Sequence, residues 1–525
     1  MTAVRRKKKR PSCGTLRRRA KHIKDPRKRR KALKRLPKRC KAPVKVPPKT
    51  GTQPSVPLVP GSGTPAPVPP PGTPYAPSGA IDSPIPVLTR PFTARDAERL
   101  LWRAGFGPRP GEAAQLAALG LERAVLSLTR PSGAATLDGA EPVVDGEPID
   151  PLGTWGHDHL YWLDRMVRSS QPLTERLALV FHDWFAVSTD AVGQRDLVFK
   201  HVDLFRAQGR GSFAALLSAV TTDPAMLVFL SGIDNRRNAI NENYAREVME
   251  LFALGADRGA YTETDVRELA RALSGWRADW VSGAGFVNFR WDPNRWDSGT
   301  KTVFGKSGAF KTQDAVDLVL AHPMHASFFV RKLWSYFVPV PPSPGVQAAL
   351  EQRYVASGHQ VLPVLEAILC SPELYDGPRM VKPAVVFEAG LLRATGQTVT
   401  TNAWEWLASM AGQRLFYPPD VSGWDDAGWL DTSTMRARWE MVNTALKGHN
   451  FTSADWDRYP AESPEQALAG ARAFWNDPAL TPEAVSALGA WATGAIGIGA
   501  SASLRAQRQN ALRMLIGMSP DHHCC

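Results

Sequence analysis

The sequence predicts an all-α protein: a large multi-helix globular domain with one short β-hairpin or ordered loop, preceded by a disordered tail. Two observations carry this prediction. Apolar residues recur every three or four positions from Thr93 almost to the end of the chain, which is the spacing of a buried helix face. A strand-like pattern appears only over residues 285–304, which is too little for a sheet. We expect a helical core domain over residues 91–450, with C-terminal helices over residues 451–520 packed on it.

The first ninety residues have no helical pattern. Residues 1–50 contain 23 Lys and Arg and one acidic residue, Asp25, so they carry +22 against a formal net charge of +14 for the chain, and the other residues carry −8. Like charges repel and there is little to bury, so this basic tail is expected to be disordered. Residues 51–90 are rich in Pro, Gly, Ser and Thr, which predicts an extended linker.

The basic tail predicts a polyanion as partner, either nucleic acid or an anionic surface. Residues 1–50 contain no aromatic side chain on which bases could stack, which argues against single-strand or sequence-specific recognition. A solvated tail without a partner, or a wrongly chosen start codon, is the alternative.

The helices follow from spacing and capping residues. Thr93 can cap the first, over residues 94–104, and Gly105 ends it. Residues 131–153 are predicted as a loop rich in Pro, Gly and Asp, and helical spacing then continues on both sides of the 285–304 excursion. The domain is either single or two tightly fused helical halves that meet near that excursion. The other expected helices are 111–119, 121–129, 155–169, 173–186, 194–207, 211–220, 241–254, 263–275, 312–321, 325–337, 346–357, 361–370, 382–395, 402–411, 434–447, 464–475, 482–494 and 502–517.

The composition bounds the protein class. The 17 tryptophans predict a large core, and the five cysteines form no disulfide framework. No run of about 18 apolar residues predicts a membrane span. No apolar segment follows the basic run, so no secretory signal is visible, which favours the cytoplasm. The tryptophans expected in the core are Trp102, Trp155, Trp162, Trp184, Trp334, Trp404 and Trp406.

Residues 241–255 have the most ordered charge pattern. On a helix, Glu242, Arg246 and Glu250 lie at i, i+4 and i+8, opposite an apolar stripe, and Gly255 can end the helix. One interpretation is a polar site wall of carboxylates around an arginine. The other, which residue types alone favour, is a surface helix with two ion pairs worth about 0.2–0.5 kcal/mol each.

A site in this domain would gather these charges with others downstream. The helix after residue 262 needs no site, because Thr262 and Asp265 can form a capping box. In a site, carboxylates would act as acid–base groups or cation ligands, and arginines would hold an anionic group. The candidate residues are Glu242, Asn243, Arg246, Glu247, Asp265, Arg271, Asp297, Lys301 and Arg331.

Histidines suggest two further places for a metal. The candidate ligands His157, His159, His182 and Asp183 are close in sequence, but alternate residues on a helix point apart, so a capped helix start is favoured. The last residues, 521–525, read as a His/Cys tail. Their His-His-Cys-Cys string could hold a soft metal, but adjacent ligands on a free end cannot close a tetrahedral site, so thiol reactivity is favoured.

Several segments resemble, in their family order over about residues 90–450, the bacterial domain-of-unknown-function 1800 family. The resemblance implies a helical protein of a kind often exported from bacterial cells, so export or the cell envelope is the alternative location. It also implies a phosphatase/sulfatase-like partner, because members are often encoded beside such proteins. It implies no established reaction. The segments are Arg103–Gly107, Asp223–Leu227, Asn241–Gly255, Tyr261–Trp276, His322–Trp334, Lys382-Pro383 and Pro418–Trp424.

The chain departs from this family pattern at two places. Many members have a Trp-His-Asn-His-Phe-like string where this chain has Phe181-His182-Asp183-Trp184-Phe185, and many have His-Asp before a Gly-x-Lys where it has Trp296-Asp297. A tryptophan thus replaces a histidine twice. If those histidines bind a metal or move protons in relatives, that chemistry is in doubt here, because tryptophan does neither.

Standard catalytic signatures are missing from the sequence. It contains no His-Glu-x-x-His, no Glu-x-x-His and no Gly-x-Ser-x-Gly. Five residues lie between Gly299 and Gly305, where a phosphate loop has four between its glycines. Gly105-Phe106-Gly107 lacks the third glycine of a dinucleotide fingerprint. No nucleotide or flavin cofactor is expected, and a divalent cation stays open.

Two functions remain. The first is an uncharacterised helical scaffold or partner-binding protein whose basic tail contacts polyanions, and the missing histidines favour it slightly. The alternative is a hydrolase-like enzyme with a carboxylate/arginine pocket that uses a cation. Convergence of the candidate charges in one concave pocket would favour the enzyme, and scatter over the exterior would favour the scaffold.

Overall fold

Helices dominate the structure, so the predicted fold class is confirmed. The computed structural model describes residues 80–452, 462–495 and 501–525, so the predicted basic tail and most of the linker lie outside the described residues. The described residues belong to one compact unit. Residues near the end of the predicted linker pack on the domain: Ile85 and Leu88 are buried, and the Leu88 N–H donates to the carbonyl oxygen of Cys370 at 2.9 Å.

The helices begin and end close to the predicted positions. Thr93 and Thr262 each form a capping box with the acidic residue three positions later, as their sequences indicate. In order, the helices are α3 (Ala94–Arg103), α4 (Glu112–Ala118), α5 (Leu121–Thr129), α6 (His157–Arg168), α7 (Pro172–Trp184), α8 (Thr189–Val192), α9 (Arg195–Gln208), α10 (Phe213–Thr221), α11 (Pro224–Phe229), η2 (Gly232–Asp234), α12 (Asn243–Glu247), η3 (Val248–Ala253), α13 (Glu263–Ala272), α14 (Thr312–Leu320), α15 (His325–Ser335), α16 (Pro344–Ala356), α17 (Val361–Cys370), α18 (Pro372–Asp376), α19 (Ala384–Thr395), α20 (Ala403–Met410), α21 (Thr432–Leu446), α22 (Pro464–Phe474), α23 (Pro482–Ala495), α24 (Ala502–Met518) and η5 (Pro520–His523).

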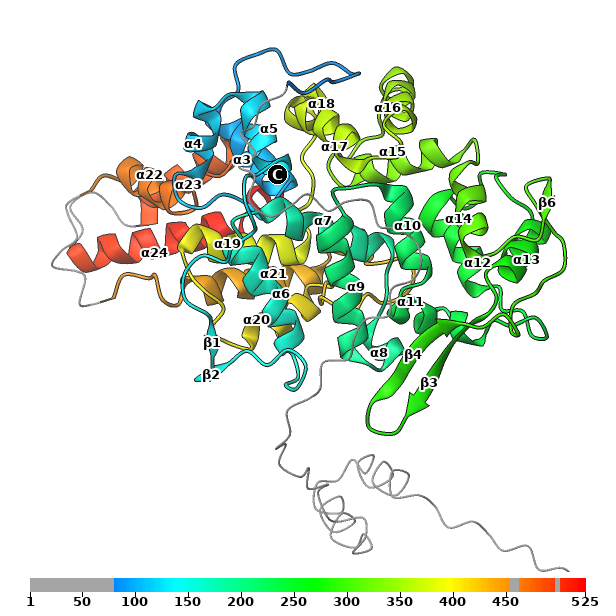
Figure 1. Ribbon diagram of the computed structural model, residues 1–525. Helices are drawn as coiled ribbons and strands as arrows, with labels where there is room; N and C mark the ends of the chain where they lie inside the picture. Colours follow the sequence, from blue (N-terminus) through cyan, green and yellow to red (C-terminus); the bar gives the residue numbers. More distant parts are fainter. Residues whose placement is uncertain (1–79, 453–461, 496–500) are drawn as a thin grey trace, which may run out of the picture. The chain divides into compact units, whose positions relative to one another are not determined.

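Helix α19 lies in the middle of the core. Every residue of α19 except Thr395 is buried, and the helix packs against α6, α20 and α21 (Figure 1). A helix that is apolar on all sides needs neighbours on all sides, which these helices supply. Helix α21 in turn contacts α24, and α24 contacts α22 and α23. The C-terminal helices are thereby joined to the core.

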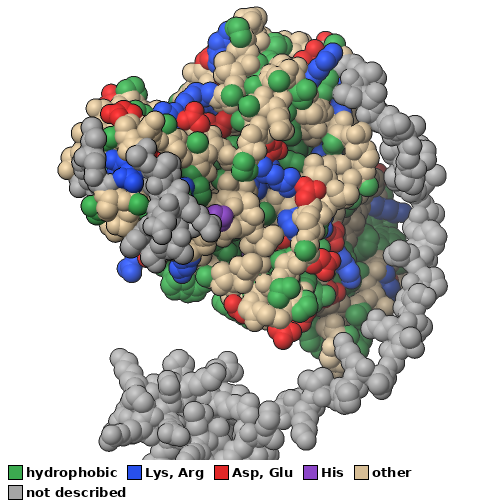
Figure 2. All heavy atoms as spheres, turned by 90° about the vertical axis from the view of Figure 1, so that its left-hand side faces the viewer, with side chains coloured by type: hydrophobic (Ala, Val, Ile, Leu, Met, Phe, Trp, Pro, Cys, Tyr) green, Lys and Arg blue, Asp and Glu red, His purple; other side chains and the backbone are tan. Residues whose placement is uncertain are grey.

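The C-terminal helices also meet the start of the domain. Asn476, just after α22, donates to the carbonyl oxygen of Pro108 at 3.0 Å, and Figure 1 shows α22 and α23 beside α3 and α4. On the face around α22–α24, Lys and Arg side chains are interspersed with Asp and Glu (Figure 2). In the part of the chain described, no helix has the length and apolar character needed to cross a membrane.

The strands differ from the prediction of one hairpin or ordered loop within residues 285–304. The described chain has three small hairpins. The residues after 285 pair backwards with 276–281, which had been assigned no strand, because the glycine-rich turn at 282–285 reverses the chain. The pairs are β1 (Val143–Val144) with β2 (Glu147–Pro148), β3 (Trp276–Val281) with β4 (Gly285–Trp291), and β5 (Lys301–Val303) with β6 (Lys306–Gly308).

The predicted helix over residues 241–254 changes type part-way. It is an α-helix up to Glu247 and a π-helix over η3, where the N–H groups of Leu254 and Gly255 both reach the carbonyl oxygen of Met249. Gly255 ends it as predicted, with φ +92°. The helical spacing of apolar residues does not distinguish these two helix types.

Two of the tryptophans predicted in the core are on the surface. Trp155 and Trp406 are 60% and 57% exposed, so the prediction was wrong for them. Trp155 precedes α6 in a loop. Trp406 lies on the outer side of α20, and the residues around it in sequence do not show which side of the helix faces solvent. The other five are buried.

The sequence had suggested that residues 521–525 form a free end, but in the structure they pair with another segment. Val381 and Cys524 form an antiparallel bridge, and the N–H and carbonyl groups of Met380 and Cys525 pair at 2.9 and 2.8 Å. Packing on the core leaves His522 only 2% exposed. The strand-like pairing satisfies backbone groups that a free end would leave to water.

Candidate functional site

The first group of predicted site residues forms an ion-pair network on the surface. Arg246 pairs with Glu263 through both terminal nitrogens, at 2.8 and 2.7 Å, and more loosely with Glu242 and Glu250 at 3.5 and 3.4 Å. Glu263 binds Arg246 and not Arg267, its neighbour four positions on, and Arg267 pairs with Glu242 at 3.5 Å. The hydrogen bonds that Arg246 donates to Glu263 raise the pKa of Arg246. The network links α12 and η3 to α13.

We expect this network to contribute little to stability. Replacing Glu242 with alanine removes two ion pairs of 3.5 Å, and exposed pairs are worth about 0.2–1 kcal/mol. The thermal unfolding midpoint should therefore fall by no more than about 2 °C. Asp196→Ala, which removes the exposed pair with Lys200, is the matched control. A loss for Glu242→Ala several times that of the control would show that the network has a larger role.

A second group lies between α13 and β5. Arg271 pairs with Asp297 at 2.8 Å and with Glu268 at 2.7 Å, and the hydrogen bonds from Arg271 lower the pKa of Asp297. The Lys301 amine donates to the carbonyl oxygen of Asp297 and lies 4.4 Å from the centre of the Trp296 ring. Every charged side chain in this group has a partner within the protein. The group therefore has a structural role, in which it holds the residues before β5 against α13.

The remaining predicted residues lie apart. Asp265 is occupied as a helix cap and accepts the Phe304 N–H at 2.7 Å. Arg331, in α15, donates to Gln347 of α16 at 2.8 Å. Asn243 is exposed and Glu247 half-buried in α12, where burial raises the pKa of Glu247. The nine candidates therefore form two separate clusters and isolated positions.

The four candidate metal ligands are not brought together either. His157 accepts the Asp150 N–H at 3.0 Å, and His159 accepts the Leu415 N–H at 3.1 Å. His182 has no hydrogen-bond partner among the described residues and is enclosed by aromatic rings, where burial lowers its pKa well below the usual value. Within residues 80–452, 462–495 and 501–525, no three His, Cys, Asp or Glu side chains are grouped so that they could hold a metal ion.

His159 instead faces a buried acid. Its Nδ1 accepts a hydrogen bond from Leu415, so the neutral ring carries its proton on Nε2, which lies 3.4 Å from Glu388 Oε2. Burial lowers the pKa of His159 to about 3. Burial, and then the charge of Glu405, raises the pKa of Glu388 well above its usual value. Both groups are therefore neutral near the pH at which free glutamate is ionised.

This pair predicts a pH dependence of stability. A carboxyl whose pKa is raised on folding stabilises the fold fully below its unfolded pKa, and that contribution is lost as pH rises through the folded pKa, by up to about 1.4 kcal/mol per pH unit. Glutamine does not ionise, so Glu388→Gln removes this decrease in stability with rising pH. We expect the variant to gain stability relative to wild type as the pH of denaturant unfolding is raised from 5 to 9. A constant difference between the two proteins would contradict the assignment.

A cavity of about 190 Å³ lies elsewhere, where three of the segments that carry the family resemblance meet helix α7. Helix α7 contributes Arg176 and Asp183, which lie seven residues apart on one helix face. The end of α15 contributes Lys332 and Tyr336, four residues apart. The residues before α19 and the loop between α20 and α21 close the other walls, and we refer to this cavity as the Asp183 pocket. Its further lining residues are Leu179, Val180, Ser335, Met380, Pro383, Gln413, Trp424, Asp426 and Trp429.

Both oxygens of Asp183 are occupied. One accepts the Trp424 N–H at 2.8 Å and the other accepts the Tyr336 hydroxyl at 2.7 Å. Burial raises the pKa of Asp183, against the effect of these hydrogen bonds. Gly423 is required for this contact, because a Cβ there would lie 2.3 Å from Asp183 Oδ1 and its φ is +97°.

The two cations of the pocket have no carboxylate partner. The Lys332 amine donates to the carbonyl oxygen of Leu251 at 2.9 Å, and burial lowers its pKa to about 8. Arg176 is 3% exposed and donates through Nε to the carbonyl oxygen of Arg103 at 3.2 Å. In the part of the chain described, neither residue has an ion pair, and the two terminal nitrogens of Arg176 have no hydrogen-bond acceptor. Burial lowers the pKa of Arg176 to about 10, so it stays charged near neutral pH.

The comparison with known families matches a model described as "Protein of unknown function (DUF1800)" over residues 99–521. The chain belongs to the DUF1800 family. No curated protein and no solved structure matches it.

The DUF1800 segments thus have a structural meaning in this chain. Lys332, Pro383 and Trp424 come from three of them, and they line one cavity with Asp183 of α7. Trp184, which stands where many DUF1800 members have histidine, is a core residue: its indole donates to the carbonyl oxygen of Phe252 at 3.0 Å. Trp184 also lies 5.1 Å from the Lys332 amine, so it forms part of the support of the pocket.

The sequence had indicated only one of these pocket residues, Asp183, and as a metal ligand. A signal for Arg176 was present, since it shares a face of α7 with Asp183. Lys332 and Trp424 lay inside segments singled out for the resemblance. Tyr336 could not be found in this way, because only the fold brings the end of α15 to α7.

Proposed function

We propose that this DUF1800 protein binds a small organic anion in the Asp183 pocket. The observation that supports it is the pair of cationic groups, Arg176 and Lys332, that line a cavity without a carboxylate partner among the described residues. Buried polar groups in native proteins are almost always satisfied, so an unmatched guanidinium calls for a missing acceptor. Carboxylates, phosphates and sulfates are the acceptors that arginine binds best.

The other walls define the rest of the ligand. Apolar side chains line much of the cavity, among them Trp424 and Trp429, whose indole N–H groups have no acceptor in the described part of the chain. A dry cavity of about 150 Å³ accommodates benzene. The cavity of about 190 Å³ therefore suits a compact ligand, with an anionic group attached to one apolar ring or short chain.

Ring-matched probes test this proposal. Isothermal titration of the full-length protein at pH 7 should show binding of benzoate, phenyl phosphate or phenyl sulfate, and at least tenfold weaker binding of benzamide and benzylamine. Arg176→Gln should weaken anion binding about ten- to a hundredfold, the loss of a charge-assisted hydrogen bond, and Arg176→Lys should restore part of it. Arg123→Gln, an exposed change on α5, is the control. Equal affinity for benzoate and benzamide would contradict an anion site.

A hydrolytic reaction at the same pocket is the alternative. Asp183 and Tyr336 form a hydrogen-bonded acid pair beside Lys332, and both acids have raised pKa values, chiefly through burial. Perturbed acids gather at catalytic sites as well as in buried networks. Release of phenol from phenyl phosphate or phenyl acetate, lost in Asp183→Asn but with benzoate binding kept, would favour hydrolysis over binding alone.

The basic tail supports a separate proposal, that residues 1–50 contact a polyanion. Its formal charge of +22 is the supporting observation, since the rest of the chain carries −8. The full-length protein should elute from heparin at higher salt than a chain beginning at Ser83. Equal elution of the two would exclude polyanion binding by the tail.

A further inference from the structure

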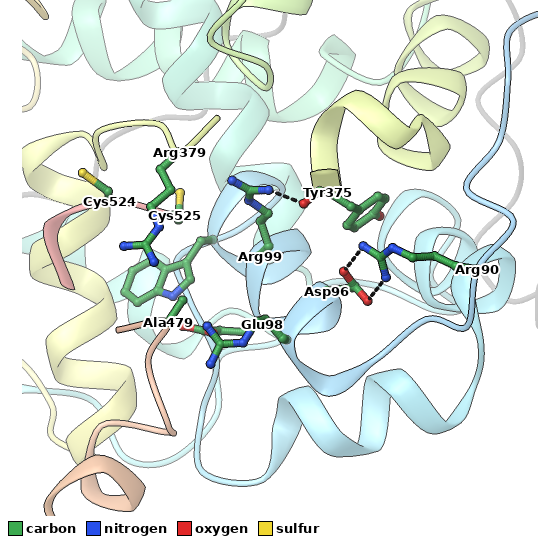
Figure 3. A pocket seen from close by; sticks show the side chains of 11 residues that line it. Arg90, Asp96, Glu98, Arg99, Tyr375, Arg379, Ala479, Cys524 and Cys525 are labelled. Carbon is green, nitrogen blue, oxygen red and sulfur yellow. Dashed lines mark hydrogen bonds and ion pairs between the residues drawn. The ribbon is translucent and has the colours of Figure 1, made fainter. Parts of the chain in front are cut away.

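A second cavity contains the only two cysteines that the described residues place side by side. It has a volume of about 220 Å³ and lies between α3, the residues after α18 and the end of the chain (Figure 3). Cys524 and Cys525 both line it, and neither forms a disulfide. We refer to it as the Cys525 pocket. The other residues that line it are Arg90, Arg95, Asp96, Glu98, Arg99, Trp102, Tyr375, Arg379 and Ala479.

The backbone that carries the two thiols is held firmly. Cys525 pairs with Met380 through both backbone groups, and Arg103 donates to the Cys525 carbonyl oxygen at 2.7 Å. The Lys382 amine donates to the His522 carbonyl oxygen at 2.7 Å. These contacts fix where the sulfur atoms lie, so the pocket is a built feature of the fold.

The surroundings of the thiols are cationic. Four arginines line the pocket against two acids. Asp96 is paired with Arg90 at 2.8 Å, and Arg379 is paired with Asp521, which is not among the lining residues, at 2.7 Å. Burial raises the pKa of the other lining acid, Glu98, which reduces its negative charge. Arg95 is exposed and has no ion pair in the described part of the chain. A positive field of this kind attracts small anions and disfavours small cations.

The two thiols have different positions. In Figure 3 the Cys525 side chain lies between Arg379 and Arg99, whereas Cys524 lies on the far side of Arg379. Burial raises the pKa of the Cys524 thiol, which reduces its thiolate fraction near neutral pH. Cys525 is therefore the better placed to react with a molecule in the pocket.

The geometry also restricts what can follow a reaction at Cys525. Adjacent Cα atoms are about 3.8 Å apart across a trans peptide, below the roughly 4.4–6.8 Å of ordinary disulfides. A Cys524–Cys525 disulfide would require the backbone to move, and the contacts with Met380 and Arg103 oppose that movement. A mixed disulfide on Cys525 should consequently persist.

We propose that Cys525 is a thiol–disulfide exchange site selective for small anionic disulfides. The thiol loses its proton to solvent, and the thiolate attacks one sulfur of the disulfide. A bond forms between that sulfur and Cys525 Sγ, the original sulfur–sulfur bond breaks, and the leaving thiolate takes a proton from solvent. The disulfide is the oxidant, so Cys525 is oxidised and one half of the disulfide is reduced.

Two disulfides of similar size and opposite charge test the proposal. Full-length protein is incubated at low salt with dithiodiglycolate, a dianion, or cystamine, a dication, and peptide mapping by mass spectrometry gives the rate at Cys525. Each rate is divided by the rate with N-acetylcysteine amide, which corrects for intrinsic reactivity. We expect the corrected rate at Cys525 to be about fivefold or more higher for the dianion, and to approach the cystamine value as salt is added.

Arginine variants locate the origin of the selectivity. Arg95→Gln should lower the preference without disturbing the fold, because Arg95 has no partner to lose. Arg379→Gln should lower it further, because it also leaves the Asp521 carboxylate without its arginine. Arg123→Gln, away from the pocket, should leave it unchanged. Three results would overturn the proposal. The corrected rates at Cys525 could be equal for the dianion and the dication, Cys13 and Cys40 could react while Cys525 does not, or the mixed disulfide could convert to a Cys524–Cys525 disulfide.

Discussion

Replacing Gly390 with alanine is expected to lower the free energy of unfolding by about 2–3 kcal/mol, the cost of overpacking a filled core. Gly390 lies within α19, where alanine would ordinarily favour the helix. An added Cβ would lie 2.1 Å from Cη2 of Trp102 and 3.1 Å from the carbonyl oxygen of Phe106. Denaturant unfolding of the full-length variant measures the loss.

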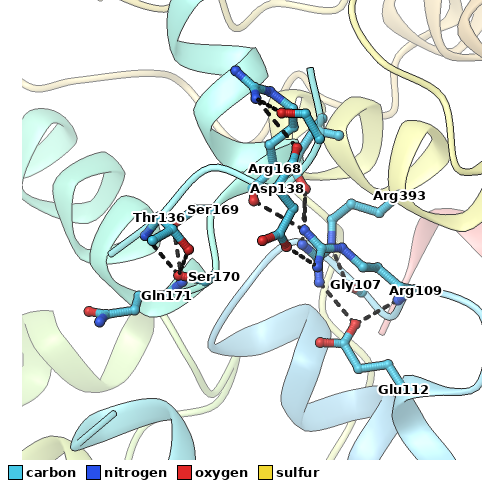
Figure 4. Close-up of polar contacts among 12 residues, drawn as sticks. Gly107, Arg109, Glu112, Thr136, Asp138, Arg168, Ser169, Ser170, Gln171 and Arg393 are labelled. Carbon is cyan, nitrogen blue, oxygen red and sulfur yellow. Dashed lines mark hydrogen bonds and ion pairs between the residues drawn. The ribbon is translucent and has the colours of Figure 1, made fainter. Parts of the chain in front are cut away.

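The Trp102 ring cannot easily move away. A Cβ on Gly107 would lie 2.6 Å from the same ring atom, so the indole already contacts that residue, and the Lys382 amine lies 3.6 Å from the ring centre. The loop is fixed as well, because Arg393 donates to the Gly107 carbonyl oxygen at 2.8 Å and pairs with Glu112 at 2.9 Å (Figure 4). The groups around the added methyl group are held in place, so they cannot move to relieve the clash.

Gly489→Ala provides the matched control. Gly489 also lies inside a helix, α23, but its Cβ would meet only Leu468 Cδ2, at 4.0 Å. There the helix propensity should decide, so the substitution should stabilise the protein by up to about 1 kcal/mol. If both substitutions changed stability in the same direction by similar amounts, packing against Trp102 would not be the cause.

The fold was predictable from sequence where the signal is local. Helix boundaries and the capping boxes at Thr93 and Thr262 depend on residues three or four positions apart, and these agree with the structure. The β3–β4 hairpin was missed because its first strand follows α13 directly, and a strand's partner is not encoded in its own spacing. The exposure of Trp155 was missed for a similar reason, since burial depends on what the chain brings against a residue.

The same distinction holds for the site. Charges that are neighbours on one helix, such as Glu242 and Arg246, form the ion pairs that their spacing predicts, but those pairs lie on the surface. The Asp183 pocket takes residues from segments more than 200 positions apart, from Arg176 to Trp429. Local spacing in one sequence draws attention to charges that are neighbours on a helix. It therefore pointed to the surface network and not to the cavity.

Above pH 8, the affinity of the Asp183 pocket for benzoate is expected to fall by up to about tenfold per pH unit. Burial lowers the pKa of Lys332 to about 8, so below that pH the free protein presents an ammonium group to the anion. Above it the amine must take up a proton before it can pair, and that step weakens binding. Benzoate remains ionised throughout, because its carboxyl group titrates far below this range. Isothermal titration from pH 6.5 to 9 measures the slope.

Arg176, Asp183, Tyr336 and Asp426 also line this cavity, and the titration of the first three can be separated from that of Lys332. Burial lowers the pKa of Arg176 to about 10, and the pKa of Tyr336 is raised well above 10, so both keep their charge state to pH 9. Asp183 has a raised pKa, and its ionisation would also weaken anion binding, so Asp183→Asn removes that contribution. In the Asp183→Asn background, Lys332→Met should bind benzoate more weakly at pH 7 and show no slope above pH 8. A slope that survives this double substitution would mean that another group controls the affinity, and that Lys332 does not contact the anion.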